Sequence, residues 1–390
     1  MPPGRTRVLS GSIDRIGDVL RPLGIGSVFV VTDPGIVRCG HAGRMLSLLI
    51  DCRASVSGFD AVRENPSKID VDRCSAALDA AVVDRFGGKE PECVLAIGGG
   101  SAIDVAKAAI LVRAGGGSIE DYRGVGSLGA RVPPLIAVPT TAGTGSEVQS
   151  FALISDESTH EKFACGDAAI APRVALLDAE LTRTMPRHVT ASTGLDTIGH
   201  ALEALVTTKG SDVSRRAARD AFVLAASAFD RVLTRADDLE AREAMLQSSS
   251  LAGLAIENSM LGAAHSIANA LTAKFEMAHG EAVALALPEV VRFNSVEPAA
   301  RALYREAAFH AGAAQSSDSD DIAIDRLIEQ MYAWIGHAGI DLLASRLRRD
   351  VHLRDLAEVA SRQWTARFNP RAVDRSAFET ILEAMIRART

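Results

Sequence analysis

The chain has 390 residues, enough for two or three domains, and its 47% hydrophobic and 23% charged residues are typical of globular proteins rather than disordered or collagen-like ones. Lysine and arginine number 42 against 49 aspartates and glutamates, a net charge of −7, and no basic cluster stands out. We therefore expect small-molecule partners, and neither nucleic acid nor an anionic membrane surface.

The five cysteines are spread along the chain without a CxxC pair, which argues against a disulfide framework. The N-terminal region lacks the apolar core of a signal peptide, and no segment approaches about 18 uninterrupted apolar residues. We expect a cytoplasmic protein with no membrane-spanning segment.

The first half of the chain alternates short β-branched runs with helical stretches. Strands are predicted at residues 27–32, 93–97, 135–139 and 174–178. Buried runs followed by helices indicate a parallel sheet with crossover helices. Residues 1–186 are thus predicted to form a Rossmann-like α/β domain.

After Pro186 the strand signal fades and alanine- and leucine-rich patterns with helical spacing begin, for example at residues 214–235, 239–253 and 324–335. Residues 187–390 are therefore predicted to form an all-helical bundle. We expect the active site in the cleft between the two domains, because ligands commonly bind there.

Two glycine-rich turns follow neighbouring predicted strands. The first is Gly98-Gly99-Gly100-Ser101, and the second is segment 139–147 with the sequence PTTAGTGSE. Glycines let backbone N–H groups approach a phosphate, and a following helix adds partial positive charge. Each turn has a simpler alternative, a tight turn or a helix cap. Their shared place after parallel strands favours nucleotide binding, since ligands of open α/β sheets collect at the carboxyl ends.

An acidic residue, Asp33, comes just after the first predicted strand. Its carboxylate can accept hydrogen bonds from the adenosine ribose and would repel a 2′-phosphate, which favours NAD over NADP. A turn aspartate before Pro34 is the alternative interpretation.

A set of possible metal ligands lies in the helical half. Asp196 and His200 are four residues apart, so on a helix they share a face about 5 to 6 Å apart at Cβ. Alone, such a pair is more often an ion pair. Of the nine histidines, however, His265 and His279 also lie among small apolar residues. One carboxylate and three imidazoles suit Fe²⁺ or Zn²⁺ rather than Mg²⁺ or Ca²⁺, and such an ion can polarise a substrate oxygen.

Several motifs together carry a family resemblance: VTD at 31–33, ENPS at 64–67, GGGSAIDVAK at 98–107, PTTAGTGSEV at 139–148, GLDTIGH at 194–200 and the stretch 262–294. The chain resembles the iron-containing (group III) alcohol dehydrogenase family, within the dehydroquinate-synthase-like fold, over nearly its whole length. The resemblance implies a homodimer and metal binding by Asp196, His200, His265 and His279. Contacts to NAD are expected from Asp33, Asn65, Gly98, Gly99, Gly100, Ser101, Asp104, Thr140, Thr141, Thr144 and Lys162.

Two positions depart from the family pattern. Many members have a histidine four residues after the third metal ligand, where this chain has Asn269, and Gln149 stands where threonine is frequent. An amide does not titrate, so the proton route is expected through water or the ribose hydroxyls, while Asn269 orients the substrate. We take Asn269 and His279 as the candidate catalytic residues.

The sequence therefore predicts a metal-dependent, NAD(P)-linked oxidoreductase that interconverts an alcohol and its aldehyde or ketone by hydride transfer. The alternatives are a maleylacetate-reductase-like or dehydroquinate-synthase-like enzyme on the same fold, or a non-catalytic nucleotide-binding protein.

Overall fold

The computed structural model describes residues 6–126, 128–157, 162–340 and 353–387. The chain divides into two compact units, Met1–Thr141 with Gly145–Met185, and Ala142–Thr144 with Pro186–Thr390. The second unit thus takes up the short segment Ala142–Thr144, which the sequence places within the first domain. No helix in the described ranges is long and apolar enough to cross a lipid bilayer.

The first unit is built on a six-stranded parallel sheet in the order β1-β9-β6-β4-β2-β3, which confirms the predicted parallel-sheet fold. The strands are β1 (Arg7–Ser10), β2 (Ser27–Val31), β3 (Ser55–Phe59), β4 (Cys93–Gly98), β6 (Leu135–Pro139) and β9 (Val174–Leu177). The four central strands agree with the predicted ones to within one residue at each end. The edge strands β1 and β3 were not predicted, because β1 is largely exposed and β3 is only half buried.

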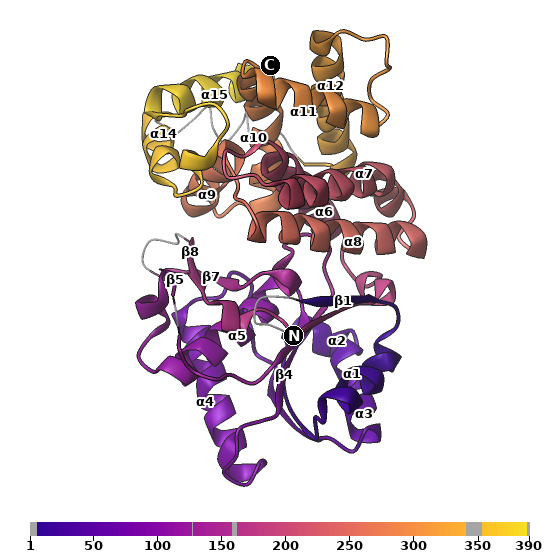
Figure 1. The fold of residues 1–390 in the computed structure, drawn as a ribbon, viewed down its shortest axis with the longest axis vertical. Helices are drawn as coiled ribbons and strands as arrows, with labels where there is room; N and C mark the ends of the chain where they lie inside the picture. Colours follow the sequence, from indigo (N-terminus) through magenta and orange to yellow (C-terminus); the bar gives the residue numbers. More distant parts are fainter. Residues whose placement is uncertain (1–5, 127, 158–161, 341–352, 388–390) are drawn as a thin grey trace. The chain divides into compact units, whose positions relative to one another are not determined.

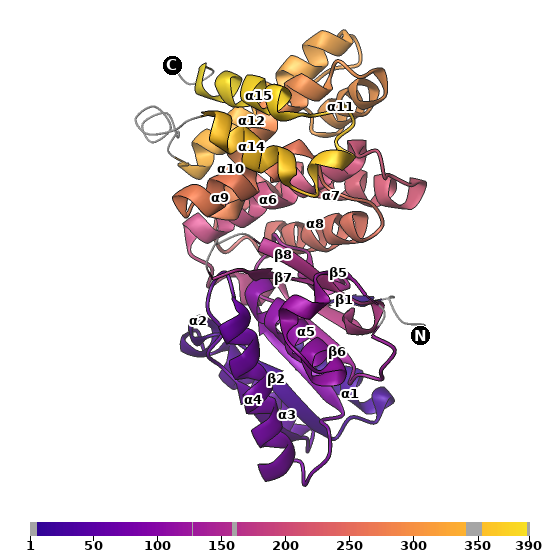
Figure 2. The ribbon, with the colours of Figure 1, turned by 90° about the vertical axis from the view of Figure 1, so that its left-hand side faces the viewer.

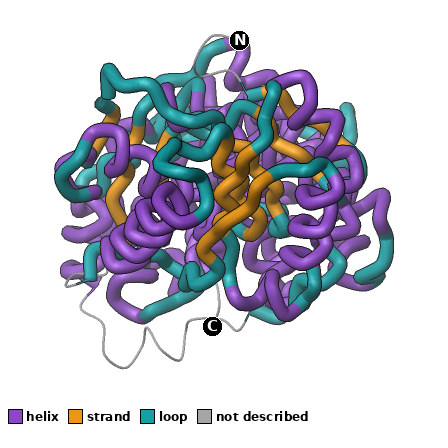
Figure 3. The backbone as a smooth tube through the Cα atoms, turned by 90° about the horizontal axis from the view of Figure 1, so that it is seen from below, coloured by secondary structure: helices purple, strands orange, loops and turns teal. Residues whose placement is uncertain are grey.

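Helices cover both faces of this sheet because successive strand residues point to opposite sides. Val28 and Val30 of β2 pack with residues of α1 and α3, whereas Phe29 and Val31 pack with residues of α4 and α5. Figure 1 shows α4 on one side of the sheet and α1 and α3 on the other, and Figure 3 shows the orange strands between purple helices. The helices are α1 (Ile16–Leu23), α2 (Pro34–Arg38), α3 (His41–Asp51), α4 (Lys68–Asp84) and α5 (Gly100–Gly115).

A second, three-stranded sheet of the first unit was not predicted. It has the order β5-β8-β7, from β5 (Gly124–Val125), β7 (Phe151–Ser155) and β8 (Lys162–Gly166), and β7 and β8 are antiparallel. Strand β8 is short and mixed in composition, and β7 carries only a four-residue apolar run, Phe151 to Ile154, with every second residue partly exposed.

The second unit is helical, and its described residues contain no strand. Its helices are α6 (Arg187–Val206), α7 (Asp212–Thr234), α8 (Leu239–Glu257), α9 (Ala263–Phe275), α10 (His279–Asn294), α11 (Pro298–His310), α12 (Asp320–Ala338), α14 (Leu353–Arg362) and α15 (Arg375–Arg387). Figure 2 shows these helices stacked on one another. The predicted helical half is confirmed, with the three predicted helices at α7, α8 and α12.

Helix α6 is the centre of this unit, since it contacts every helix from α7 to α12. Close packing there depends on small residues. A Cβ atom at Gly199 would lie 2.4 Å from Val283 Cγ1 of α10, and one at Gly280 would lie 2.1 Å from the Ser192 carbonyl oxygen of α6. Glycine at these two positions therefore lets α10 approach α6 closely, which brings the first residue of α10, His279, beside α6.

Candidate functional site

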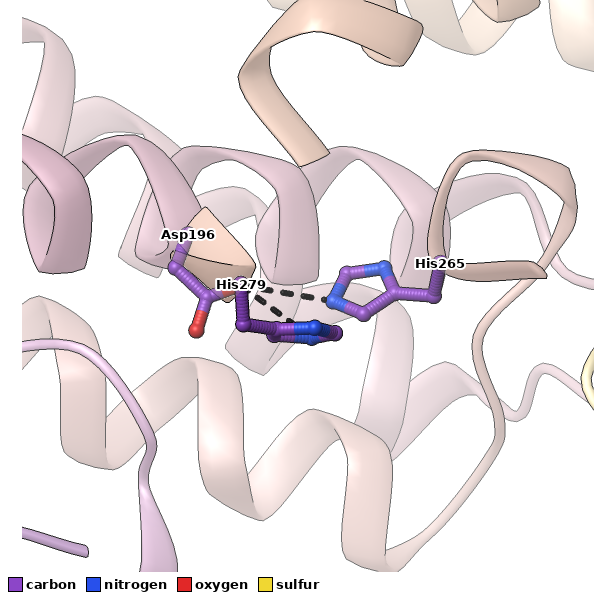
Figure 4. A group of neighbouring side chains, drawn as sticks. All are labelled: Asp196, His265 and His279. Atoms are coloured by element: carbon purple, nitrogen blue, oxygen red, sulfur yellow. Dashed lines mark ion pairs between the residues drawn. The ribbon is translucent and has the colours of Figure 1, made fainter. Parts of the chain in front are cut away.

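Three helices of the second unit supply the predicted metal ligands. Asp196 and His200 lie on one face of α6, His265 lies in the first turn of α9, and His279 is the first residue of α10. The Nε2 atoms of His265, His200 and His279 lie 3.5, 3.6 and 4.0 Å from Asp196 Oδ1, respectively. Figure 4 shows Asp196, His265 and His279 pointing toward one another. The structure thus brings together four residues drawn from three separate segments of sequence.

The geometry of this group fits a metal ion. One atom each from Asp196, His265 and His279 lies within 4.8 Å of the others. Around a tetrahedral ion with bonds of about 2.1 Å, ligand atoms are about 3.4 Å apart, close to the observed separations. Among the described residues, the buried atoms Asp196 Oδ1 and His265 Nε2 have no hydrogen-bond partner. Buried polar atoms are rarely left without a partner, and a bound cation would satisfy both.

The surroundings shift the pKa values of Asp196, His200 and His265 in different directions. Burial alone would raise the pKa of Asp196, but His200, His265 and His279 around it lower that pKa below its ordinary value. Burial, with the neighbouring His265, lowers the pKa of His200. Burial also acts to lower the pKa of His265, but the nearby carboxylates of Asp196 and Glu203 raise it to about 9. The site therefore favours an anionic Asp196 and a neutral His200, the protonation states in which both bind metal.

In two of the histidines, Nδ1, the ring nitrogen that does not face Asp196, contacts an oxygen atom of the protein. His200 Nδ1 is 3.1 Å from the Gly143 carbonyl oxygen, and His265 Nδ1 is 2.5 Å from Glu203 Oε2. Gly143 belongs to the short segment that joins the second unit, and Thr197 Oγ1 also donates to it at 3.4 Å. Glu203 is not among the predicted site residues, although it lies three residues after His200 on the same face of α6, a spacing that could have indicated it.

His279 is the most exposed member of the group, with 21% of its side chain accessible against 8% or less for the other three. A small molecule can reach the group most readily from this side. The predicted substrate-orienting residue, Asn269, lies one helical turn after His265 on α9, and its Nδ2 donates to Gln363 Oε1 at 3.1 Å.

In the first unit, the two predicted phosphate-binding turns lie side by side at the carboxyl ends of β4 and β6. These strands are neighbours in the sheet, and the Thr140 N–H donates to the Gly98 carbonyl at 2.9 Å. A Cβ atom at Gly99 would lie 3.2 Å from Thr141 Cγ2. Helix α5 begins directly after Gly99, which brings no side chain to cap it. Gly99 therefore does not cap the first N–H groups of α5, at Gly100 and Ser101, and these groups suit an anion.

Asp33 lies at the same edge of the sheet, just after β2. Its Oδ1 accepts hydrogen bonds from the N–H groups of Gly35 and Ile36 and caps α2, as the alternative interpretation of this residue predicts. A Cβ atom built at Gly98 would lie 3.1 Å from Asp33 Oδ2, so the second oxygen faces the first glycine turn. Capping α2 through one oxygen is therefore compatible with a ribose contact through the other.

Asp104 and Lys107 of α5 form a buried network with the second turn. The Ser146 hydroxyl donates to Asp104 at 2.5 Å, and Lys107 Nζ donates to the Ser146 hydroxyl at 2.8 Å and to the Phe151 carbonyl at 2.9 Å. The described contacts of Asp104 are thus with the protein itself. They indicate that Asp104 fixes the turn that begins at Pro139.

The last two predicted cofactor residues, Asn65 and Lys162, belong to segments that meet. Asn65 is exposed and adopts a left-handed backbone conformation with φ of 49°. The Ser155 N–H donates to the Pro66 carbonyl at 2.8 Å, and Ser155 pairs with Lys162 in the small sheet. Thr144, by contrast, belongs to the segment that joins the second unit.

Comparison with known proteins matches both halves of the chain to one family. The family model for iron-containing alcohol dehydrogenase matches residues 3–179, and the model for the C-terminal part of the Fe-containing alcohol dehydrogenase family matches residues 190–386. The NAD-dependent methanol dehydrogenase of Bacillus methanolicus is 31% identical over 365 residues, 90% of this chain and 94% of that protein. Choline dehydrogenase of Bacillus subtilis is 36% identical over 289 residues, 73% of this chain and 69% of that protein.

Solved structures agree with these relatives. The crystal structure of a 1,3-propanediol oxidoreductase superposes with a TM-score of 0.90 at 28% identity and covers 97% of both chains. Sulfoacetaldehyde reductase from Bifidobacterium kashiwanohense in complex with NAD⁺ gives a TM-score of 0.84 at 28% identity, over 99% of this chain and 98% of that one. The chain therefore belongs to the iron-containing alcohol dehydrogenase family.

Proposed function

We propose that the protein is a metal-dependent, NAD-linked oxidoreductase that interconverts a small alcohol with its aldehyde or ketone. The observation that carries this proposal is the convergence of three imidazole Nε2 atoms on Asp196 Oδ1, inside a buried group whose Asp196 and His265 atoms have no hydrogen-bond partner among the described residues. Family membership supports the same reaction class.

Asp196, His200, His265 and His279 would hold the ion, and their N and O atoms suit Fe²⁺ or Zn²⁺. When bound, a divalent ion would act as a Lewis acid on the substrate oxygen while NAD takes up or releases the hydride. Asp196 supplies the one anionic ligand, and His200 and His265 are oriented by the groups behind them. His279, the most exposed of the four, borders the side from which substrate enters.

The first unit would bind the dinucleotide through backbone groups more than through side chains. The N–H groups at the start of α5 and the Thr140 and Thr141 turn suit the pyrophosphate, and Asp33 Oδ2 suits a ribose hydroxyl, which favours NAD over NADP. Two relatives support NAD, since the methanol dehydrogenase is named NAD-dependent and the sulfoacetaldehyde reductase was solved with NAD⁺. The proposed cofactor residues are Asp33, Asn65, Gly98, Gly99, Gly100, Ser101, Asp104, Thr140, Thr141, Thr144 and Lys162.

Asn269 would orient the substrate without exchanging a proton, because an amide does not titrate. Gln363 holds its Nδ2 group, which leaves the Asn269 carbonyl oxygen as the acceptor for a substrate hydroxyl. The proton of the alcohol would then leave through water or the ribose hydroxyls.

We also propose a cytoplasmic homodimer. All five cysteines are free, which suits a reducing compartment. The largely exposed edge strand β1 presents backbone groups that a second copy of the chain could pair with.

The test is NADH formation or consumption with a panel of alcohols and aldehydes, including aldehydes with phosphonate, sulfonate or carboxylate tails. Metal-stripped protein should be inactive and recover with Fe²⁺ or Zn²⁺. His265→Ala should abolish turnover while NAD still binds. His337→Ala is a matched control, because this exposed histidine is ion-paired with Asp230 on the surface and should be dispensable. Full activity of the metal-stripped protein would overturn the proposal.

A further inference from the structure

Glu203 is a buried acidic residue that belongs to none of the predicted ligand sets. It lies on α6, seven residues after Asp196, and is 3% exposed. Within the described ranges, its ion pair is with His265, and no lysine or arginine neutralises it. An isolated buried carboxylate is costly, so its place in the fold requires a physical reason.

Both oxygens of Glu203 accept hydrogen bonds from the start of α9. Oε1 accepts from the Ala264 N–H at 2.7 Å, and Oε2 accepts from the His265 N–H at 3.3 Å and also lies 2.5 Å from His265 Nδ1. Backbone N–H groups can only donate, so each Glu203 oxygen already accepts at least one hydrogen bond. An imidazole nitrogen is also a stronger base than a carboxylate oxygen, so the hydrogen shared by the two groups belongs to the ring. The His265 Nδ1 atom must therefore carry the hydrogen in this contact.

The hydrogen on Nδ1 determines the state of the other ring nitrogen of His265, Nε2. A neutral imidazole has one N–H, so a hydrogen on Nδ1 leaves a lone pair on Nε2. His265 Nε2 is the buried atom that lies 3.5 Å from Asp196 Oδ1 and has no hydrogen-bond partner in the described part of the chain. Because Glu203 holds the Nδ1–H, Nε2 is the ring nitrogen that exchanges its proton for a metal ion.

The charges of the buried carboxylates also favour a bound cation. Asp196 and Glu203 are both buried, and their ion pairs among the described residues are with histidines alone. Two carboxylates with no lysine or arginine partner match the charge of one divalent cation. The Glu203 carboxylate also lies beside the first turn of α9, where the partial positive charge of the helix N-terminus stabilises it.

We propose that Glu203 is a positioning residue of the metal site, which fixes the tautomer and the orientation of His265 through its Nδ1–H and so increases the affinity for the ion. The arrangement is a carboxylate–histidine–metal triad, in which the outer carboxylate makes the imidazole a stronger ligand. The inference rests on the metal site of the proposed function.

A purely structural role is the competing explanation, since Glu203 also caps α9. The two explanations separate at Asn369, whose Oδ1 accepts from the Ala263 N–H at 3.2 Å and caps the same helix. Among the described hydrogen bonds, none joins Asn369 to the ring of His265; the others that Asn369 makes are with Asn294 and Arg371.

The experiment compares Glu203→Gln with Asn369→Ala in the full-length protein. Dissociation constants for Zn²⁺ are measured by competition with a chromophoric chelator, and the melting temperature of each metal-free protein reports the cost to the fold. In Glu203→Gln, one atom of the isosteric amide is a donor, so the amide cannot accept from both Ala264 N–H and His265 Nδ1–H. We expect Zn²⁺ affinity about 10- to 100-fold weaker in Glu203→Gln, and a lower melting temperature but near-unchanged Zn²⁺ affinity in Asn369→Ala.

Equal Zn²⁺ affinity in Glu203→Gln and the wild type, or an equal loss in both variants, would overturn the role of Glu203 while leaving the metal site intact. A wild-type protein that binds no Zn²⁺ would instead overturn the site and the proposed function together. Should Glu203→Gln fail to fold, ¹⁵N NMR of histidine side chains in Zn²⁺-loaded wild type decides the matter, with His265 assigned by its loss in His265→Ala. We expect a protonated Nδ1 on His265, and an unprotonated Nδ1 would refute the inference.

Discussion

Asp104 of the first unit and Asp196 of the second are both buried aspartates on helices, 8% and 6% exposed, and they differ in what their oxygens contact. Asp104 accepts from the Ser146 hydroxyl and the Leu153 N–H, with Lys107 Nζ 3.8 Å away. Asp196 Oδ1 faces three imidazole nitrogens and has no hydrogen-bond partner among the described residues. A satisfied carboxylate holds segments of the protein together, whereas an unsatisfied one suits a bound ligand.

The pKa values of the two carboxyl groups shift in opposite directions because their neighbours differ. Burial raises the pKa of Asp104, and Lys107 with the hydrogen-bond donors offsets only part of that effect. Burial acts on Asp196 as well, but the surrounding imidazoles outweigh it and lower its pKa. The first unit thus uses buried polar side chains to fix its turns and offers backbone N–H groups to a ligand, while the second unit offers the side chains themselves.

The largest effect is expected from Asp196→Asn. The substitution removes the one anionic member of the group and places an uncharged amide among three imidazoles, so metal binding should be lost. Because Lewis-acid activation is worth several kcal/mol, turnover should fall by about 10³-fold or more. Bound metal is measured by elemental analysis and turnover by NADH absorbance.

Asp104→Asn is the matched control, since it makes the same chemical change at an equally buried aspartate. It should lower the melting temperature of the protein and leave metal content unchanged. If Asp104→Asn lost the metal as well, or Asp196→Asn kept both metal and activity, the distinction between the two aspartates would be wrong.

The next largest effect is expected from Lys107→Met, which tests the network of the first unit. Lys107 is fully buried, and its ammonium group bonds Ser146 and the Phe151 carbonyl beside Asp104. Methionine fills similar space but leaves Asp104 without its counter-charge, and breaking a buried pair in this way costs about 3–5 kcal/mol. Urea unfolding measures the loss of stability, and Zn²⁺ affinity should not change. An unchanged unfolding midpoint would show that this network does not hold the turn.

The fold could be predicted where the sequence carries continuous apolar runs. The strand Cys93–Gly98 is buried at every position, and its β-branched and aliphatic residues identify it directly. The strand Ser55–Phe59 contains two serines and a glycine and packs at the edge of the sheet, so its assignment depends on pairing with β2 rather than on its own residues. Strands whose stability comes from neighbours cannot be recognised from local sequence.

The candidate site also has one part that the sequence predicts and one part that it does not. The spacing of Asp196 and His200 on one helix was visible in the sequence, and the small apolar surroundings singled out His265 and His279. The pairing of each ring with its partner could not be predicted, because Glu203 is 62 residues from His265 and Gly143 is 57 residues from His200 along the chain. Contacts of this kind arise only when α6, α9 and the segment at Ala142–Thr144 pack together.

The smallest effect is expected at Asp70, a third buried carboxylate, which belongs to the first unit. It is 1% exposed, and its oxygens accept from the Arg63 side chain at 2.8 and 2.9 Å and from the Ser67 N–H at 3.0 Å, in a capping box at the start of α4. Burial acts to raise the pKa of Asp70, but these hydrogen bonds lower it below its ordinary value. Like Asp104, Asp70 is thus a carboxylate satisfied by the protein.

Because the folded pKa of Asp70 is lowered, its stabilising contribution is present above the pKa of the unfolded chain, about 3.9, and is lost as the pH falls through the folded value. Asp70→Asn should therefore lower the free energy of unfolding by about 1 kcal/mol at neutral pH, the usual value of a helix cap. The difference from the wild type should shrink as the pH falls below about 4. Urea unfolding of both proteins at neutral and acidic pH measures it, and a difference independent of pH would mean that the charge of Asp70 contributes nothing.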